Sequence, residues 1–138
     1  MSYMKSIITS CVVAASLAGC VSGAPRANDH TPANDYLAYA GAPIDSFHIN
    51  RLDNWQVVGP NQLVLWSTPW QAYLVTVWSS CSQLPFANRL AVTSTVGSVS
   101  KFESIVLRNG TRCPIDEIRP IDLKQMQADR ALRQDTQA

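Results

Sequence analysis

Cysteine and histidine are the side chains of this sequence best suited to nucleophilic, redox or metal chemistry. The 138 residues include four cysteines and two histidines, namely Cys11, Cys20, Cys81, Cys113, His30 and His48. A thiol can be acylated, oxidised to a disulfide or coordinate a metal, and its surroundings decide which of these happens. No two cysteines stand in a Cys-x-x-Cys arrangement, so the spacing gives no support for a thiol redox centre or a zinc site.

Cys20 ends a segment that is typical of exported proteins. Lys5 supplies a positive charge, and the apolar run from Ile7 to Leu17 is too short to cross a bilayer as a helix. The small residues Ala18 and Gly19 precede the cysteine, an arrangement that resembles the lipobox of bacterial lipoproteins. That resemblance implies lipidation of Cys20 and cleavage before it. The alternative is an ordinary signal peptide with a cysteine at its cleavage site.

The residues after Cys20 predict where a lipidated chain would reside. Two or more acyl chains are needed for stable anchoring, and a triacylated cysteine supplies them. In Gram-negative lipoproteins an aspartate after the cysteine retains the protein in the inner membrane. Here Val21 and Ser22 follow it. By this resemblance we expect a lipid-anchored protein on the periplasmic face of the outer membrane.

Cys81 and Cys113 remain for the folded part once Cys11 leaves with the signal and Cys20 is lipidated. An isolated pair in an oxidising periplasm predicts a disulfide. The alternatives are a redox pair or two zinc ligands. Neither finds support, because the domain contains a single histidine, His48, and no ligand cluster. We therefore predict neither a metal site nor a cofactor.

The composition divides the chain into four parts. Residues 1–19 form the signal peptide, and the polar residues 20–34 read as a flexible tether. The β domain spans 35–122, and a helical or disordered tail rich in Gln, Lys, Arg, Ala and Asp spans 123–138. The exported part is long enough for one domain at most.

After Pro43 the apolar residues follow the period of two that is typical of β-strands. Turn residues such as Gly59-Pro60-Asn61 separate short strands, and Gln71–Ser79 is apolar on both faces, which predicts a central strand. No spacing suggests parallel strands joined by helices. We therefore expect an all-β fold, a small antiparallel sandwich or barrel of six or seven strands with a C-terminal helical tail.

Two local details of the sheet can also be predicted. Asn109-Gly110 is a strong hairpin signal, and a two-residue type I′ loop there would place Cys113 opposite Val106. The neighbouring carboxylates Asp116 and Glu117 would point to opposite faces of a strand, which places them poorly for paired acid–base catalysis.

From about Asp45 to Asp122 the chain resembles a family of small, uncharacterised proteobacterial lipoproteins. The resemblance is carried by Tyr73-Leu74 with the following Cys81, by Phe86-Ala87-Asn88-Arg89-Leu90, by Val99-Ser100-Lys101-Phe102-Glu103 and by Arg112-Cys113-Pro114-Ile115-Asp116-Glu117-Ile118. It implies a lipid anchor and a disulfide, and it implies no activity.

The charge balance and the aromatic residues bear on the kind of partner. Eleven basic against ten acidic residues argue against nucleic acid, which requires a basic surface. Of the four tryptophans, we expect Trp55, Trp66 and Trp78 in the core. Trp70 falls at a turn, where it is a candidate partner contact. Arg51, Arg89 and Lys101 either meet an acidic partner or pair with Asp53 and Glu103, and Arg51 is the second candidate contact.

These features favour a binding or envelope-assembly module over an enzyme. The expected partners are the membrane, which the chain binds through its N-terminal lipid, and an envelope protein. An immunity or inhibitor protein directed against a secreted toxin is the alternative. An envelope hydrolase would need His48 beside a serine or a carboxylate, and no Gly-x-Ser-x-Gly motif is present. No catalytic residue is predicted.

Overall fold

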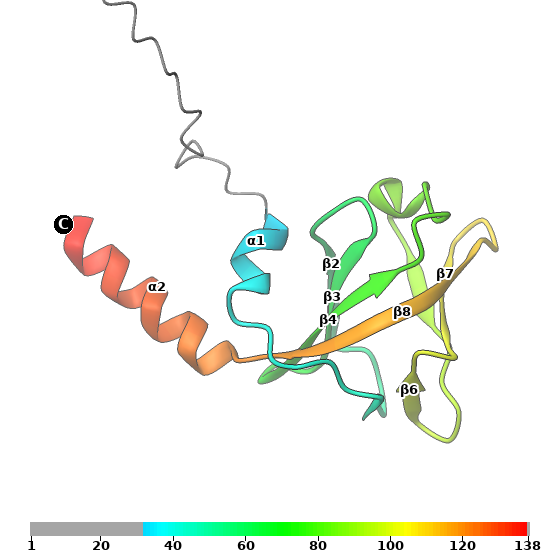
Figure 1. Ribbon diagram of the computed structural model, residues 1–138, viewed down its shortest axis with the longest axis horizontal. Coiled ribbons are helices and arrows are strands. Elements are labelled where there is room, and N and C mark those ends of the chain that lie inside the picture. The colour runs from blue at the N-terminus through cyan, green and yellow to red at the C-terminus, as the bar shows by residue number, and fades with distance from the viewer. Residues whose placement is uncertain (1–31, 138) are drawn as a thin grey trace, which may run out of the picture.

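The computed structural model describes residues 32–137, which form a strongly curled sheet with two helices on one side (Figure 1). The strands are short and separated by turns, except for one long strand that joins the hairpin end of the sheet to the C-terminal helix. In chain order the elements are α1 (Pro32–Leu37), β1 (Ser46–His48), β2 (Asn54–Val57), β3 (Gln62–Thr68), β4 (Gln71–Val77), the 3-10 turn η1 (Leu84–Phe86), β5 (Leu90–Val92), β6 (Ser98–Ser100), β7 (Ser104–Leu107), β8 (Arg112–Ile121) and α2 (Leu123–Gln137).

Six strands form an antiparallel half-barrel in the order β2-β3-β4-β8-β7-β5, and β1 pairs with β6 in a separate two-stranded sheet. The predicted antiparallel β fold with a C-terminal helix is confirmed. The described residues contain eight strands instead of six or seven. The additional strand arises because the segment from Val99 to Arg108, which the sequence pattern predicts as one strand, is divided by a turn into β6 and β7.

Strands β3 and β4 are neighbours in the sheet, and both are buried on their two faces. Leu63 and Leu65 point into a core inside the curl, together with Val75 and Val77 of the next strand. Val64 lies on the opposite face, in a second cluster that also includes residues of α1 and α2. This two-sided burial explains why Gln71–Ser79 is apolar on both faces, and it confirms that β4 is central.

Helix α1 and the first turn of α2 pack on the outer face of these strands, and the rest of α2 extends away from the sheet (Figure 1). From α1, Ala33 and Tyr36 pack in the second cluster, and Met126 of α2 reaches the same cluster with 2% of its surface exposed. Asp122 begins α2, since its side-chain Oδ1 accepts a hydrogen bond from the backbone N–H of Gln125 at 3.0 Å. Helix α1 starts at Pro32, so the helix takes up the end of the segment 20–34 that we expected to be a tether.

The β7–β8 hairpin differs from the predicted two-residue loop. The amide of Gly110 donates to the carbonyl of Leu107 at 2.9 Å, so the turn is centred on Arg108-Asn109, and Gly110 takes the positive φ of +85° as the bulge residue. The dipeptide Asn-Gly is compatible both with a two-residue type I′ loop and with the three-residue loop found here. As a result Cys113 lies opposite Ile105, and the prediction that it would face Val106 is wrong.

A bulge in β8 overturns the prediction for the two neighbouring carboxylates. Thr76 pairs with Glu117 and Val77 pairs with Ile115, which leaves Asp116 as the extra residue. The inward-facing positions therefore change from odd to even numbers between Ile115 and Ile118, both of which are buried. Asp116 and Glu117 consequently line one small surface cavity instead of facing opposite sides.

Candidate functional site

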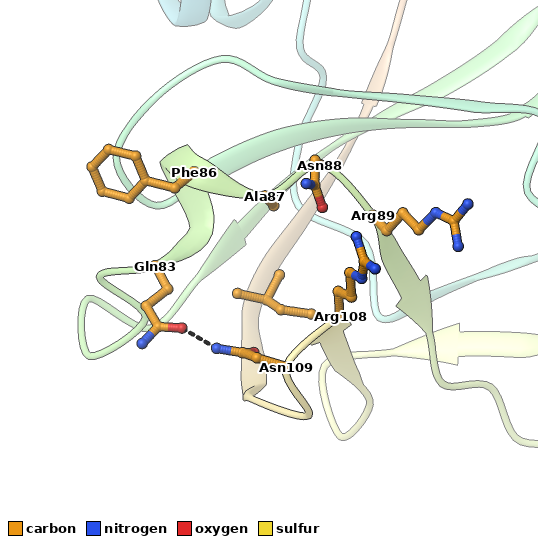
Figure 2. A pocket seen from close by; sticks show the side chains of 8 residues that line it. Gln83, Phe86, Ala87, Asn88, Arg89, Arg108 and Asn109 are labelled. Carbon is orange, nitrogen blue, oxygen red and sulfur yellow. Dashed lines mark hydrogen bonds between the residues drawn. The ribbon is translucent and has the colours of Figure 1, made fainter.

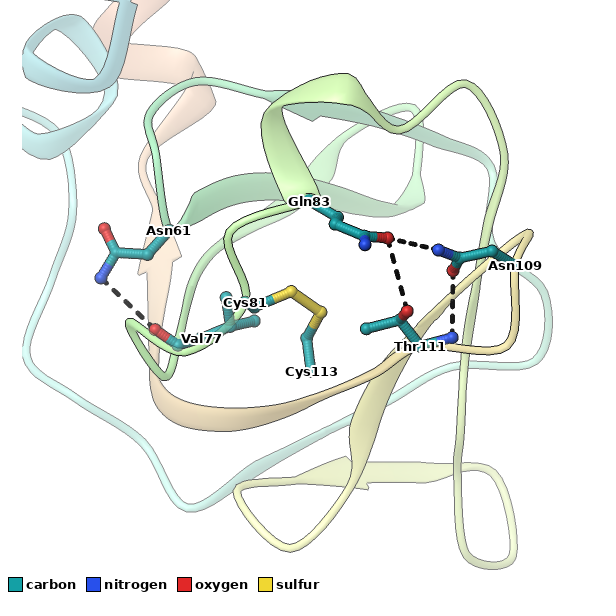
Figure 3. The surroundings of a disulfide bond; sticks show 7 residues. All are labelled: Asn61, Val77, Cys81, Gln83, Asn109, Thr111 and Cys113. Carbon is teal, nitrogen blue, oxygen red and sulfur yellow. Dashed lines mark hydrogen bonds between the residues drawn. A yellow bond between two sulfur atoms is a disulfide. The ribbon is translucent and has the colours of Figure 1, made fainter.

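A disulfide fixes the segment that follows β4 against the start of β8 (Figure 3). The Cα atoms of Cys81 and Cys113 are 5.4 Å apart, and both side chains are buried in the core. The predicted disulfide is therefore present, and the register of β8 places Cys113 on the inner face, where it meets Cys81. The segment from Cys81 to η1 is covalently tied to the hairpin end of the sheet.

Hydrogen bonds of Gln83 strengthen the same connection (Figure 3). Its side-chain Oε1 accepts hydrogen bonds from the Asn109 amide and, at 3.5 Å, from the Thr111 hydroxyl. Asn109 in turn accepts a hydrogen bond from the backbone N–H of Thr111 at 3.0 Å. The η1 segment and the β7–β8 turn therefore form two walls held in a fixed relation.

Between these walls lies a cavity of about 330 Å³ (Figure 2). Leu107, which is buried, contributes to its apolar part together with Ala87, while Phe86 is 84% exposed. In Figure 2, Arg108 extends toward Asn88, and the ring of Phe86 lies on the other side of Ala87. The residues that line the cavity are Gln83, Phe86, Ala87, Asn88, Arg89, Leu107, Arg108 and Asn109.

Two arginines line this cavity. The β5–β7 ladder ends at the pair of Leu90 with Leu107, and Arg89 and Arg108 are the residues just beyond that pair. In Figure 2 the side chain of Arg89 extends away from Arg108. Both are exposed, and neither forms an ion pair or a side-chain hydrogen bond among the described residues. Both charged residues that line the cavity are therefore positive.

The candidate contact residues Trp70 and Arg51 lie at the other end of β4. Trp70 stands in the β3–β4 turn with 78% of its surface exposed. Arg51 lines a surface cavity of about 450 Å³ with Pro69 of the same turn and with the end of β3. The cavity also includes Ser67 of β3, whose hydroxyl has no hydrogen-bond partner among the described residues. The structure thus brings Arg51 next to the turn that carries Trp70, although the two residues are far apart in the sequence.

The other tryptophans follow the prediction in part. Trp55 and Trp66 are half-buried, the first against the inner core and the second against the outer cluster. Trp78 is 58% exposed, so its prediction as a core residue is wrong. It shares the outer face with Leu74, but α1 is only six residues long and covers that face near Leu74, leaving the end of β4 open.

The expected surface ion pairs do not form. The described residues contain one salt bridge with both partners in the β domain, from Arg119 Nε to Glu117 Oε1 at 2.5 Å. Glu103 instead accepts hydrogen bonds from the hydroxyls of Thr93 and Thr95, the latter at 2.6 Å. These two hydrogen bonds lower the pKa of the Glu103 carboxyl, and the bond from Thr93 has the larger effect. Lys101 lies over the Phe102 ring at 5.9 Å.

The residues that a hydrolase or a metal site would use are spread over the surface. His48 is exposed, and within the described residues it has no hydrogen bond to a serine or a carboxylate. Its ring lies beside Gly97, where an added Cβ would be 3.2 Å from the His48 Cε1 atom. In residues 32–137 no three His, Cys, Asp or Glu side chains group together in a way that could hold a metal ion.

Cys20, the tether before Pro32 and the predicted signal segment lie outside the described residues. Lipidation and export therefore stay predictions from the sequence. No helix between residues 32 and 137 combines the length and the apolar character that a membrane span requires.

Comparison with known proteins places the chain in a family without assigning an activity. No curated protein and no solved structure matches it. The model of a family of unknown function matches residues 3–137, and this confirms the resemblance to an uncharacterised family. Because that match covers almost the whole sequence, the chain belongs to the family of unknown function DUF6491.

Proposed function

We propose that this protein is a lipid-anchored binding module of the bacterial envelope, held on the periplasmic face of the outer membrane. The sequence Leu17-Ala18-Gly19-Cys20 after an apolar run supports the anchor. We accordingly place the protein among the proteobacterial lipoproteins. The disulfide between Cys81 and Cys113 supports export, because disulfides persist in oxidising compartments.

The exposure of Trp70 is the observation that carries the binding role. An indole that is 78% exposed costs hydration free energy in the free protein, and tryptophan is enriched among residues that dominate interface energies. Arg51 and the neighbouring surface cavity add a cation and hydrogen-bonding groups beside it. Together they offer an aromatic anchor with a polar rim, the arrangement typical of a protein–protein contact.

Site-specific crosslinking in intact cells tests this role. A photo-crosslinking residue in place of Trp70 is expected to capture a discrete envelope partner, and the same residue in place of Leu132, which is 66% exposed on α2, is the matched control. Capture from both positions equally, or from neither, would contradict the contact. A captured secreted toxin would favour the inhibitor alternative over an assembly role.

Fractionation tests the anchor separately. The Cys20→Ser variant is expected to accumulate as an unprocessed precursor and to lose its membrane retention, because the thioether cannot form. Unchanged sedimentation of the Cys20→Ser chain with outer membranes would refute lipidation at this residue. A chain that is soluble in the periplasm in its native form would do the same.

A further inference from the structure

We propose that the cavity between η1 and the β7–β8 turn is a binding site for a phosphate group carried by a small organic molecule or by a lipid headgroup, with Arg89 and Arg108 as its ligands. The site lies where β4 ends and β8 begins, at the opposite end of the sheet from Trp70. It is therefore a second surface, and it does not depend on the contact proposed for Trp70.

The charge of the cavity selects the ligand class. Arg89 and Arg108 bring two positive charges, and none of the residues lining the cavity is acidic. A phosphate monoester carries a charge of about −2 near neutral pH and so balances both arginines, whereas a single carboxylate balances one. A dianion bound between the two guanidinium groups would form an attractive contact with each of them.

The hydrogen-bonding groups agree with this choice. Each guanidinium presents a planar fork of N–H donors that matches two oxygens of a phosphate. When the exposed side chain of Arg89 turns toward Arg108, the two forks can serve the three terminal oxygens of a monoester, which is more than a carboxylate offers. The amides of Asn88 and Asn109 line the same cavity and supply further donors.

The two walls of the cavity are joined before a ligand arrives. The disulfide from Cys81 to Cys113 and the bonds from Asn109 and Thr111 to Gln83 join the two walls. A preorganised cavity loses less conformational entropy on binding than a flexible loop does. Leu107 and Ala87 supply an apolar part for the organic portion of the ligand, with the exposed Phe86 beside them.

Calorimetric titration of the full chain in detergent micelles tests the site, with phenyl phosphate, inorganic phosphate and benzoate as probes. We expect both phosphates to bind, phenyl phosphate more tightly, and benzoate at least tenfold more weakly than phenyl phosphate. Arg89→Gln and Arg108→Gln should each weaken phenyl phosphate about tenfold or more. Arg130→Gln, which changes an exposed arginine of α2, is the matched control and should leave the affinity unchanged.

Vesicles distinguish the two sources of phosphate. The Cys20→Ser chain is used here, because it lacks the acyl anchor that would hold the chain on any vesicle. Its retention on phosphatidylcholine vesicles that contain phosphatidic acid, reversed by phenyl phosphate and lost when Arg108→Gln is added, would assign the site to a lipid headgroup. Binding of phenyl phosphate without such retention would assign it to a soluble phosphate. The proposal is overturned if neither phosphate binds, if benzoate binds as tightly as phenyl phosphate, or if the three arginine variants behave alike. Trp70→Ala should bind phenyl phosphate normally, so this test and that of the envelope partner fail independently.

Discussion

The hydroxyl of Thr93 donates a hydrogen bond to the carboxylate of Glu103, and the backbone N–H of Ser104 donates to the same hydroxyl at 2.8 Å. The segment after β5 is thereby joined to the start of β7. Thr95 adds a second donor to the carboxylate. This small network holds the edge of the half-barrel against the two-stranded sheet through one ionised group.

The Glu103 network predicts an acid-sensitive contribution to stability. The folded-state pKa of Glu103 is lowered by the hydrogen bonds from Thr93 and Thr95, so the contribution is fully present above the unfolded-state pKa of about 4.3 and is lost as the pH falls through the folded-state value. The free energy of unfolding of Glu103→Gln should lie below that of the wild type at pH 7, and the difference should shrink on acidification. Urea titrations between pH 7 and pH 3 measure it.

Thr93→Val with Thr95→Val is the matched variant for this prediction, because it removes both donors and keeps the charge. In that background Glu103→Gln should have little pH-dependent effect. A difference between wild type and Glu103→Gln that stays constant from pH 7 to pH 3 would contradict the assignment.

Reduction of the disulfide should destabilise the domain strongly. Cys81 and Cys113 are separated by 32 positions, and closing a loop of this length contributes about 3 to 4 kcal/mol in the chain-entropy model. We therefore expect reductant to lower Tm by roughly 10 °C or more. A Cys81→Ala, Cys113→Ala double variant should have a Tm close to that of the reduced wild type, and reductant should not change it. An unchanged Tm with both thiols shown free by mass spectrometry would refute the prediction.

Much of this architecture could be predicted from the sequence, because alternation and turn residues are local signals. The two-sided apolar pattern of Gln71–Ser79 indicates β4, and the isolated cysteine pair indicates the bridge. That Arg89 and Arg108 line one cavity could not be predicted, since it depends on the register of β5 against β7. The exposure of Trp78 likewise depends on how far the short helix α1 reaches. That Asp116 and Glu117 line the same cavity depends on a bulge that has no clear sequence signal.

Val96 offers a stabilising substitution. It has a φ of +51° and is 94% exposed in the turn between Thr95 and Ser98, where the next residue, Gly97, has a φ of +72°. A β-branched residue in the left-handed region costs roughly 1 kcal/mol, and asparagine tolerates this region far better. Val96→Asn should therefore raise the free energy of unfolding by about 0.5 to 1.5 kcal/mol in urea titrations.

Gly97→Ala provides the opposite control for the turn. An added Cβ would meet the carbonyl oxygen of Ile49 at 3.3 Å and would also strain the backbone, so this variant should be less stable than the wild type. If the free energy of unfolding of Val96→Asn is equal to or lower than that of the wild type, the turn tolerates valine without strain.

The attachment of α2 depends on a single buried side chain. Met126 is 2% exposed in the outer cluster, and beyond it the helix is held by the hydroxyl of Tyr39, which donates to Asp129 Oδ2 at 2.8 Å and has its pKa raised by this bond. Met126→Ala should cost about 2 to 5 kcal/mol. Leu132→Ala, on the exposed part of the helix, should cost less than about 0.5 kcal/mol. Similar losses in both variants would contradict this assignment.

The double-sided burial of β3 and β4 has a consequence for how the domain opens. Release of the helical cover would uncover Val64 and Leu74 but leave the side chains inside the curl in place, since these lie on the other face of the same strands. We therefore expect amide protons in the middle of the sheet to exchange with solvent through complete unfolding, and those of α2 to exchange through local detachment of the helix. The domain would then open in two steps, with the helical cover leaving before the β interior.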